Sequence, residues 1–416
     1  MNFLNKLSAC ALVCGITAAF AAGFSILEQS PSGIGRALAG MTAETNDPSS
    51  LYYNPSSVAW FDHPSLVLGT HILTGNCRFH DTGHSTMDGG KSGDIIGTSF
   101  IPNLAYVHPL GDGLTLNLTM SATSGTETNY PWDWMGRYFA VNTSIAVIEF
   151  QPSIAYRITD DLSIGIGLMG QYADMEMEQA LDVAAEGLPR NDTRMKLEGD
   201  TFTCGFTAGV TWKALERTTL GLSYRSKMSH DFDLDASYKR GYASVYSGVL
   251  GGDADLSLDM PQSVNFGIVQ ELTPSWKIMA DVAWTDWSVM DEMKVKFKKN
   301  GVESTEVMKW HDSWRFALGT EYKIDEKWTV RAGTAFDERA VTNHYTKTCK
   351  LPDSNRYWMS MGCSYQYSEH MRLDLAWTHI IFQPSSIHQT HTDGRYIDGK
   401  VSGYTNLISV GMKYDF

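Results

Sequence analysis

The sequence has 416 residues, of which 33 are basic and 47 acidic, so its formal net charge is -14. Its mean hydropathy is -0.22, and no run after the first apolar stretch approaches the roughly 18 apolar residues of a membrane helix, which excludes a helical membrane bundle. The acidic balance argues against a partner nucleic acid. Frequent glycine (37) and 12% aromatic residues favour a β-rich chain with tight turns.

Residues 1–21 have the pattern of a secretory signal peptide. Lys6 gives a basic start, residues 7 to 18 form a short apolar run, and Ala19-Phe20-Ala21 is a small-x-small cleavage site. We therefore expect an exported mature chain that begins at Ala22. The cysteines beyond this point allow three disulfide pairings or free thiols, and they are Cys77, Cys204, Cys349 and Cys363.

Residues 22–63 do not alternate as a β-strand does. Glycine and proline punctuate them, as in Ser32-Gly33-Ile34-Gly35 and Asn54-Pro55. The glycine pair does not indicate a nucleotide-binding loop, because no strand precedes it. Because residues 64–416 read almost throughout as strands, we expect residues 22–63 to plug a barrel formed by the rest.

Fourteen segments after Pro64 have strand character, and the connections between them alternate between tight turns and loops of about 14 to 30 residues. This layout predicts an all-β fold, a fourteen-stranded antiparallel transmembrane barrel in the outer membrane of a Gram-negative bacterium. The expected strands are 65–75, 98–109, 113–123, 143–158, 161–175, 196–213, 217–228, 258–272, 275–288, 311–324, 327–339, 355–367, 370–383 and 402–416.

Alternation within the strands separates a membrane barrel from a soluble sandwich. Near the C-terminus, Leu373 and Leu375 share one face while Arg372 and Asp374 share the other, as expected for a lipid face and a lumen face. The chain ends on Phe416, an aromatic terminus that suits recognition by barrel-assembly machinery. Tryptophans at the strand ends predict two aromatic belts in contact with membrane lipids, with Trp212, Trp276 and Trp328 beside short turns and Trp132, Trp134, Trp284, Trp287, Trp310 and Trp314 beside long loops.

Alternation also directs several charged side chains into the lumen. Because buried charges must be paired, we expect an ion-pair network there, or one arginine that grips a substrate carboxylate at two points. The sequence does not say which arginine. The charged residues are Arg225, Arg315, Arg331, Asp337, Arg356, Arg372 and Asp374.

Two long loops carry apolar residues, with helical spacing in one and a continuous run in the next. Apolar loops that face water commonly mark a binding surface, and the alternative is a lid whose residues pack only on one another. The residues expected to capture a ligand there are Leu181, Ala184, Leu188, Val245, Tyr246, Val249 and Leu250.

Several short motifs, in order and over nearly the whole mature chain, resemble the long-chain fatty-acid transporters of the bacterial outer membrane. That family also includes importers of toluene-like hydrocarbons. The motifs are Ala22-Gly23-Phe24, Ser32-Gly33-Ile34-Gly35-Arg36-Ala37, Asn54-Pro55, Tyr224-Arg225-Ser226, Trp284-Thr285-Asp286-Trp287-Ser288, Arg315-Phe316-Ala317-Leu318-Gly319-Thr320, Trp328-Thr329-Val330-Arg331-Ala332-Gly333, Ala335-Phe336-Asp337 and Pro352-Asp353-Ser354-Asn355-Arg356-Tyr357-Trp358.

The resemblance implies a fourteen-stranded barrel with an N-terminal hatch and passive uptake of long-chain fatty acids or related hydrophobic molecules. It implies that Asn54-Pro55 touches a kink in the third strand, through which the ligand leaves sideways, and that Ala22-Gly23-Phe24 lies near the ligand pocket. We expect the kink between residues 121 and 125, at Ser124-Gly125. This chain has Ser56 where the family usually has alanine.

Other functions stay open at this point. A general water-filled porin is one alternative, although it would need no forty-residue plug, and an aromatic-hydrocarbon importer of the same fold is another. No serine and histidine pair indicates a lipase, so we expect no enzyme activity. We also expect no cofactor and a monomer. His80, His84, His388 and His391 lie in polar loops without metal-ligand spacing, so no metal site is predicted.

Overall fold

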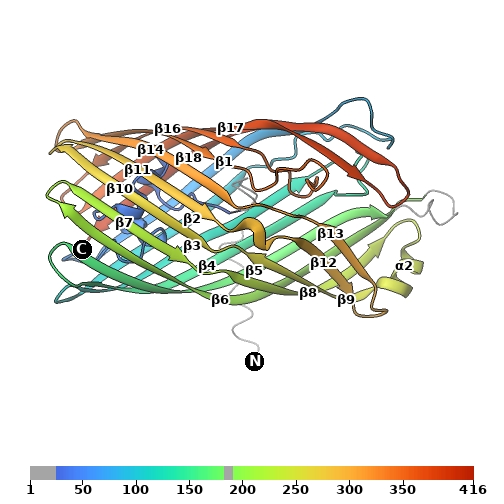
Figure 1. The fold of residues 1–416 in the computed structure, drawn as a ribbon, viewed down its shortest axis with the longest axis horizontal. Helices are drawn as coiled ribbons and strands as arrows, with labels where there is room; N and C mark the ends of the chain where they lie inside the picture. The colour runs from blue at the N-terminus through green and yellow to red at the C-terminus, as the bar shows by residue number, and fades with distance from the viewer. Residues whose placement is uncertain (1–24, 182–190) are drawn as a thin grey trace.

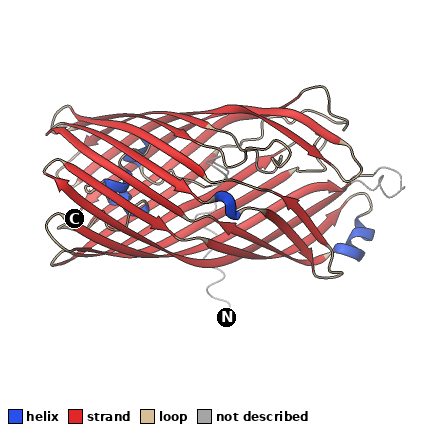
Figure 2. Ribbon diagram, viewed as in Figure 1, coloured by secondary structure: helices blue, strands red, loops and turns tan. Residues whose placement is uncertain are grey.

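A computed structural model describes residues 25–181 and 191–416, in which the strands close into an antiparallel barrel (Figure 1; Figure 2). Each barrel strand pairs with the strand on either side of it. The sheet closes because β1 (Ser65–Asp81) pairs with both β2 (Ser99–Gly111) and β18 (Tyr396–Asp415).

Four barrel strands are interrupted midway, so each carries two labels. The two halves are β7 with β8, β9 with β10, β11 with β12, and β13 with β14, because each half pairs with the matching half of its neighbour. The eighteen labelled strands of the described residues therefore make fourteen barrel strands, and the expected strand number is confirmed.

The bounds of the other strands follow. They are β3 (Leu114–Asn129), β4 (Asn142–Arg157), β5 (Leu162–Leu181), β6 (Thr193–Leu215), β7 (Thr218–Arg225), β8 (Met228–Lys239), β9 (Gly252–Met260), β10 (Ser263–Thr273), β11 (Trp276–Thr285), β12 (Glu292–Phe297), β13 (Glu303–Val307), β14 (Ser313–Lys323), β15 (Trp328–Asp337), β16 (Arg356–Gln366) and β17 (Met371–Thr390).

The halves nearer the short turns have an apolar outer face and a polar inner face. On β7, Leu222 is exposed on the outside while Ser223 is buried on the inside, and on β14 Phe316 is exposed while Arg315 is buried. Exposed aliphatic and aromatic side chains are what a strand presents to lipid. We call this part of the barrel the membrane-level wall.

Beyond the interruptions the same strands invert this pattern. On β8, Phe232 and Leu234 are buried inside while Asp231 and Asp233 face out, and β9 repeats the arrangement. Along the chain, inward positions change from odd to even residue numbers at Ser226-Lys227 and from even back to odd at Pro261-Gln262. We call this part the outer wall, because its outer face suits water and its inner face is apolar.

This inversion corrects the expected strand ends. Residues 229–257 and 289–310 were expected to be loops, yet much of them forms β8, β9, β12 and β13. At Ser226-Lys227 and at Pro261-Gln262 the apolar residues keep their even numbers, but the even positions face outward in the membrane-level wall and inward in the outer wall. The apolar residues therefore no longer mark a lipid face in the outer wall.

The expected tryptophan belts are also partly wrong. Trp212, Trp276 and Trp328 are exposed on the outside near the short turns, and so is Trp314 at the other side of the membrane-level wall. In contrast, Trp134, Trp287 and Trp310 are buried, and the rings of Trp287 and Trp310 lie 5.2 Å apart. Trp287 and Trp310 lie at the interruptions between β11 and β12 and between β13 and β14, and Trp134 lies in the loop between β3 and β4.

The N-terminal segment, which we define as residues 25–64, contains three short helices. They are α1 (Pro31–Ile34), η2 (Met41–Ala43) and η3 (Pro48–Tyr52). Ser30 caps α1 and Asp47 caps η3 by accepting backbone N–H bonds, and a proline follows each cap. Figure 1 shows the segment in blue within the barrel, toward the end where the C-terminus lies.

The described residues outside this segment contain two other helical elements, α2 (Ala243–Leu250) at the long-loop end and η5 (Trp287–Val289) at one interruption. None of the helices in the described part of the chain is long and apolar enough to cross a membrane.

Candidate functional site

A ring of glycines on the inner face of the membrane-level wall seats the N-terminal segment. A methyl group built at Gly333 would lie 2.3 Å from the backbone of Arg36, and one at Gly221 would lie 2.0 Å from the carbonyl oxygen of Thr42. Glycine is needed at such positions because backbone approaches backbone. The glycines face each other across strands in four pairs, Gly69 with Gly411, Gly165 with Gly209, Gly221 with Gly267 and Gly319 with Gly333.

A continuous ion-pair network fixes the same segment to β14–β17. Burial alone would raise the pKa of Asp47, but the Arg372 guanidinium together with Ser32 and Ser49 holds it well below its usual range. The network therefore joins charged residues of the N-terminal segment to charged residues of the barrel wall. Its contacts are Glu44–Arg36 (2.9 Å), Arg36–Glu321 (3.5 Å), Glu321–Arg331 (2.6 Å), Arg331–Asp374 (3.8 Å), Asp374–Arg372 (3.0 Å) and Arg372–Asp47 (2.6 Å).

Asn54 and Pro55 lie against β5 and β6, which corrects their expected position beside the third strand. The Asn54 amide donates to Thr42 O (2.8 Å), Val210 O (3.3 Å) and Thr211 Oγ1 (3.1 Å). Ser56 Oγ lies 2.7 Å from Thr211 Oγ1 as well. The expectation failed because a glycine of the wall, Gly209, leaves room for Asn54 there.

The third strand is irregular within the expected range, and other residues of the segment meet it. The register between β3 and β4 shifts between Ala122 and Ser124. The Ile26 N–H donates to Thr123 O (2.8 Å), and the Gln29 side chain donates to Ala122 O (2.5 Å). Backbone acceptors freed by the bulge are thus satisfied by residues 25–29.

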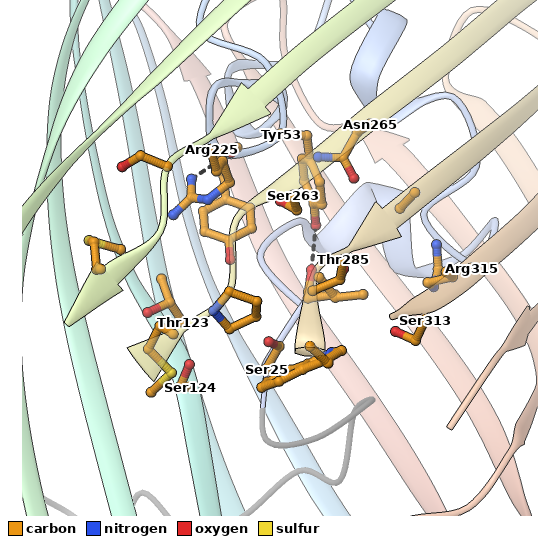
Figure 3. Close-up of a pocket in the computed structure, with 18 of the residues that line it drawn as sticks. Ser25, Tyr53, Thr123, Ser124, Arg225, Ser263, Asn265, Thr285, Ser313 and Arg315 are labelled. Atoms are coloured by element: carbon orange, nitrogen blue, oxygen red, sulfur yellow. Dashed lines mark hydrogen bonds between the residues drawn. The ribbon is translucent and has the colours of Figure 1, made fainter. Parts of the chain in front are cut away.

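Beside the bulge lies a cavity of about 110 Å³ (Figure 3). Leu27, Tyr53 and Met228 give it an apolar side, and Thr123, Ser124 and Asn265 contribute polar groups. It is smaller than the roughly 150 Å³ cavity that holds a benzene molecule, so it has room for a polar head with a few carbons and not for a long chain.

Two arginines line this cavity, and their environments differ. Arg225 donates to both carboxylate oxygens of Glu149, each at 2.7 Å, and stacks on Tyr52 with its guanidinium carbon 4.6 Å from the ring centre. Gln151 and the Tyr52 carbonyl accept its remaining bonds at 2.9 and 3.2 Å. This guanidinium is therefore fully engaged.

Arg315 has no such partner. Among the described residues, no carboxylate lies within 4.0 Å of its guanidinium, although the side chain is only 7% exposed. Its Nη2 donates to Ala37 O (2.7 Å), its guanidinium carbon lies 5.0 Å from the Trp358 ring centre, and Nε has no hydrogen-bond partner. Asp337, the residue of β15 directly opposite Arg315, pairs instead with Arg356 at 3.3 Å. An unpaired buried cation beside a cavity suits an anionic ligand.

The remaining charged residues of the predicted lumen set are inside and paired. Arg331, Arg372 and Asp374 belong to the network described above, and Arg356 also lies 3.5 Å from Asp353. Acidic partners were missing from the sequence-based set, above all Glu149, Glu321 and the acids of the N-terminal segment. Extending the alternation through each strand would have placed Glu149 and Glu321 on the inner face. It would not have placed Glu28, Glu44 and Asp47, because these residues lie outside strands.

The outer wall encloses an apolar interior rich in methionine. Methionine is flexible and fills irregular apolar space, which suits contact with varied chains. Its members include Met169, Met175, Met177, Met228, Phe232, Leu234, Leu256, Met260, Met290, Met293 and Phe297.

The predicted capture residues divide into three groups. Leu181, Tyr246 and Leu250 pack against the apolar interior of the outer wall. Val245 and Val249 of α2 are 56% and 52% exposed. Ala184 and Leu188 lie outside the described residues, as do Ala22, Gly23 and Phe24, so their predicted roles stay predictions.

Within residues 25–181 and 191–416, no three metal-ligating side chains gather. The four cysteines there are free, with Cys77 and Cys349 buried.

Comparison with known proteins identifies the family. The family model described as outer membrane protein transport protein (OMPP1/FadL/TodX) matches residues 12–416. This chain belongs to that family. It is an outer-membrane protein of the Gram-negative type, in agreement with the resemblance found in the sequence. Members of the OMPP1/FadL/TodX family are transport channels rather than enzymes.

Relatives in the family support the assignment along the whole chain. The chain is 28% identical over 391 residues to the long-chain fatty acid transport protein of Escherichia coli, with 86% of each chain covered. It is 27% identical to outer membrane protein P1 of Haemophilus influenzae, with both chains covered completely.

Solved structures agree with the fold. A Pseudomonas aeruginosa FadL homologue superposes with a TM-score of 0.89 at 24% identity, covering 95% of this chain and all of that one. The Pseudomonas putida toluene transporter TodX superposes with a TM-score of 0.70 at 17% identity, covering 94% and 99%.

Proposed function

We propose that this protein is a channel for passive uptake of long-chain fatty acids, or closely related amphipathic acids, across the outer membrane. Relatives that cover 86% and 90% of the chain are named for long-chain fatty acid transport. Among the described residues, the unpaired guanidinium of Arg315 beside the cavity is the observation that favours an acid over an aromatic hydrocarbon. A hydrocarbon would leave this buried charge without a partner.

The inversion of the strands supports a route for the apolar tail. A ligand that enters from the long-loop end meets the apolar inner face of the outer wall, where Phe232, Leu256 and Met293 gather. Transfer of an alkyl chain from water into such surroundings is favourable by roughly 0.8 kcal/mol per buried methylene group. A water-filled porin would have no use for this interior.

The N-terminal segment would serve as the hatch of this channel. We propose a signal peptide over residues 1–21, a hatch over 22–63 and a barrel over 64–416. Contacts with β1, β2, β3, β7, β10, β16, β17 and β18 support this division, because only a segment inside the barrel meets strands on all sides. Exit would be lateral, at the β3 bulge, where residues 25–29 occupy the freed backbone groups.

Uptake of labelled oleate by a strain that lacks its own transporter tests the proposal. Cells that make this chain should accumulate oleate faster than cells that make an Arg315→Met variant, while both should take up neutral hexadecane at similar rates. An Arg217→Met variant, which alters an exposed turn, is the matched control and should behave as wild type. Equal oleate uptake with and without the chain would contradict the proposal.

Conductance separates the hatch-gated channel from a porin. In a planar bilayer the intact protein should show little steady conductance, because residues 25–64 fill the lumen. A large steady conductance of the intact protein would support the porin instead.

A further inference from the structure

His230 is a polar side chain inside the apolar interior of the outer wall. The buried inner-face side chains of β8 and β9 are otherwise apolar, apart from Tyr238, whose hydroxyl donates to Leu250 O at 3.3 Å. The His230 ring is 0% exposed, and neither Nδ1 nor Nε2 has a hydrogen-bond partner among the described residues. A buried polar group without a partner is costly, so His230 calls for one from outside the chain.

His230 stands one row of side chains beyond the cavity. Met228 lines the cavity, and its partner across the sheet, Met260, lines the cavity too. Two residues further along β8, toward the long loops, His230 pairs in the same way with Leu258. Alternate residues of a strand lie about 7 Å apart. The imidazole is therefore close to the cavity, on the side from which a ligand would arrive.

The tail of a bound acid has to leave the cavity past this row. A cavity of about 110 Å³ beside Arg315 takes the carboxylate and only a few carbons. Met228 and Met260 line this cavity and also belong, with Leu258, to the continuous apolar cluster of the outer wall. Methionine side chains are flexible and can make way for an alkyl chain. The rest of the tail would therefore lie in this apolar interior, beside His230.

The imidazole suits a neutral oxygen on that tail. Burial lowers the pKa of His230 to about 4, so the ring is neutral near pH 7 and presents one N–H donor and one nitrogen acceptor. The guanidinium of Arg315, which keeps its charge, is the stronger partner for the carboxylate. An unsubstituted alkyl tail offers His230 no hydrogen bond, whereas a hydroxyl group can donate one or accept one.

We propose that His230 selects long-chain fatty acids that carry a hydroxyl group on the alkyl tail, and that it hydrogen-bonds this hydroxyl while Arg315 holds the carboxylate. The proposal rests on the proposed function, which supplies the acid, and adds the substrate class within it. A site that pairs with a hydroxyl discriminates against the analogue that lacks it, because the buried polar group of the protein is then left unpaired.

Competition against labelled octadecanoate, with purified wild-type protein, tests the preference. The competitors are octadecanoates with one hydroxyl group at carbon 2, 6, 10 or 14. The 2-hydroxy acid keeps its hydroxyl beside the carboxylate and should bind no more tightly than octadecanoate. At least one of the others should bind about ten-fold more tightly, as expected for one additional hydrogen bond to a buried partner. If none of them binds more tightly than octadecanoate, the proposal is wrong.

Two variants assign the preference to the imidazole. His230→Leu has a side chain of similar size without the two nitrogens, and it should bind the hydroxy acids less tightly than octadecanoate, because a buried hydroxyl without a partner is costly. His80→Leu changes an exposed histidine of β1 and should keep the wild-type preference. A wild-type preference in His230→Leu would overturn the proposal.

Uptake by cells separates this role from another, in which the imidazole binds the carboxylate of every passing acid. With the ligand well below its Kd, His230→Leu should take up the preferred hydroxy acid several-fold more slowly than wild type and oleate at the wild-type rate. An equal loss for both acids would overturn the proposal in favour of the passing carboxylate. Failure of the wild-type chain to take up oleate would instead contradict the proposed function, so the two can be told apart.

Discussion

The N-terminal segment is held in two different ways along its length. From Pro31 to Pro55 it rests on paired glycines of the wall and is fixed by an ion-pair network in which buried charges have partners. From Ser25 to Gln29 it has no ion pair among the described residues, and hydrogen bonds and the buried Ile26 side chain hold it next to a cavity, an unpaired Arg315 and an unpartnered Glu28 oxygen. The exit that we propose needs only these residues to move, so we call residues 25–29 the weakly held end, in contrast to the part that the ion-pair network fixes.

Removal of one charged side chain from the ion-pair network should have the largest effect on the free energy of unfolding. Arg372→Met leaves the buried carboxylates of Asp47 and Asp374 without this partner, which should cost roughly 3–5 kcal/mol. Denaturant unfolding of the purified barrel would measure the loss. The matched triple variant with Asp47→Asn and Asp374→Asn should recover most of it, and a triple variant as unstable as the single one would contradict the ion-pair account.

Filling the glycine seat should have the next largest effect. In Gly333→Val the new side chain meets the backbone of Arg36 and should cost about 1–3 kcal/mol through overpacking. Limited proteolysis should then cleave residues 30–61 more readily, while the barrel itself stays folded. Gly248→Val in exposed α2, where no atom lies within 4 Å, should leave the cleavage rate unchanged.

A covalent link at the weakly held end should lower uptake with little change in stability. Ser25 and Ser124 are antiparallel bridge partners, so cysteines there are suitably placed for a disulfide. In a background with the four native cysteines changed to serine, oxidised Ser25→Cys/Ser124→Cys should take up oleate at least about ten-fold more slowly, about 1.4 kcal/mol in the barrier. Reduction should restore uptake, and an oxidised protein of normal rate would show that the exit lies elsewhere.

The smallest expected effect is that of removing the Gln29 side chain from the weakly held end. Gln29→Ala removes the bond to Ala122 O and should lower the protection of neighbouring amides by about 1 kcal/mol. Hydrogen exchange would measure it. A change confined to residues 30–55 would contradict the division between fixed and weakly held parts.

Much of the barrel could be predicted from the sequence because lipid imposes a simple pattern on strands. Alternating apolar residues such as Leu373 and Leu375 gave the strand number and the lumen face. The outer wall was missed because its outer face meets water and its inner face is apolar. Beyond Ser226 and Pro261 the apolar residues of the strands therefore point inward, whereas in the membrane-level wall they point outward.

The candidate site was only partly predictable. Alternation placed Arg225 and Arg315 in the lumen, but nothing local distinguishes them, because pairing depends on Glu149, which lies three strands away along the wall. The role of the wall glycines was hidden for a similar reason. Each reads as an ordinary small residue until strands pair and bring Gly319 opposite Gly333.

The most direct test of the account is a structure of the protein with bound dodecanoate. We expect the carboxylate beside the Arg315 guanidinium in the cavity of Figure 3, the first carbons of the alkyl tail on the apolar side of that cavity, and residues 25–29 displaced from Thr123. A carboxylate bound away from Arg315, with Ile26 still bonded to Thr123, would contradict it.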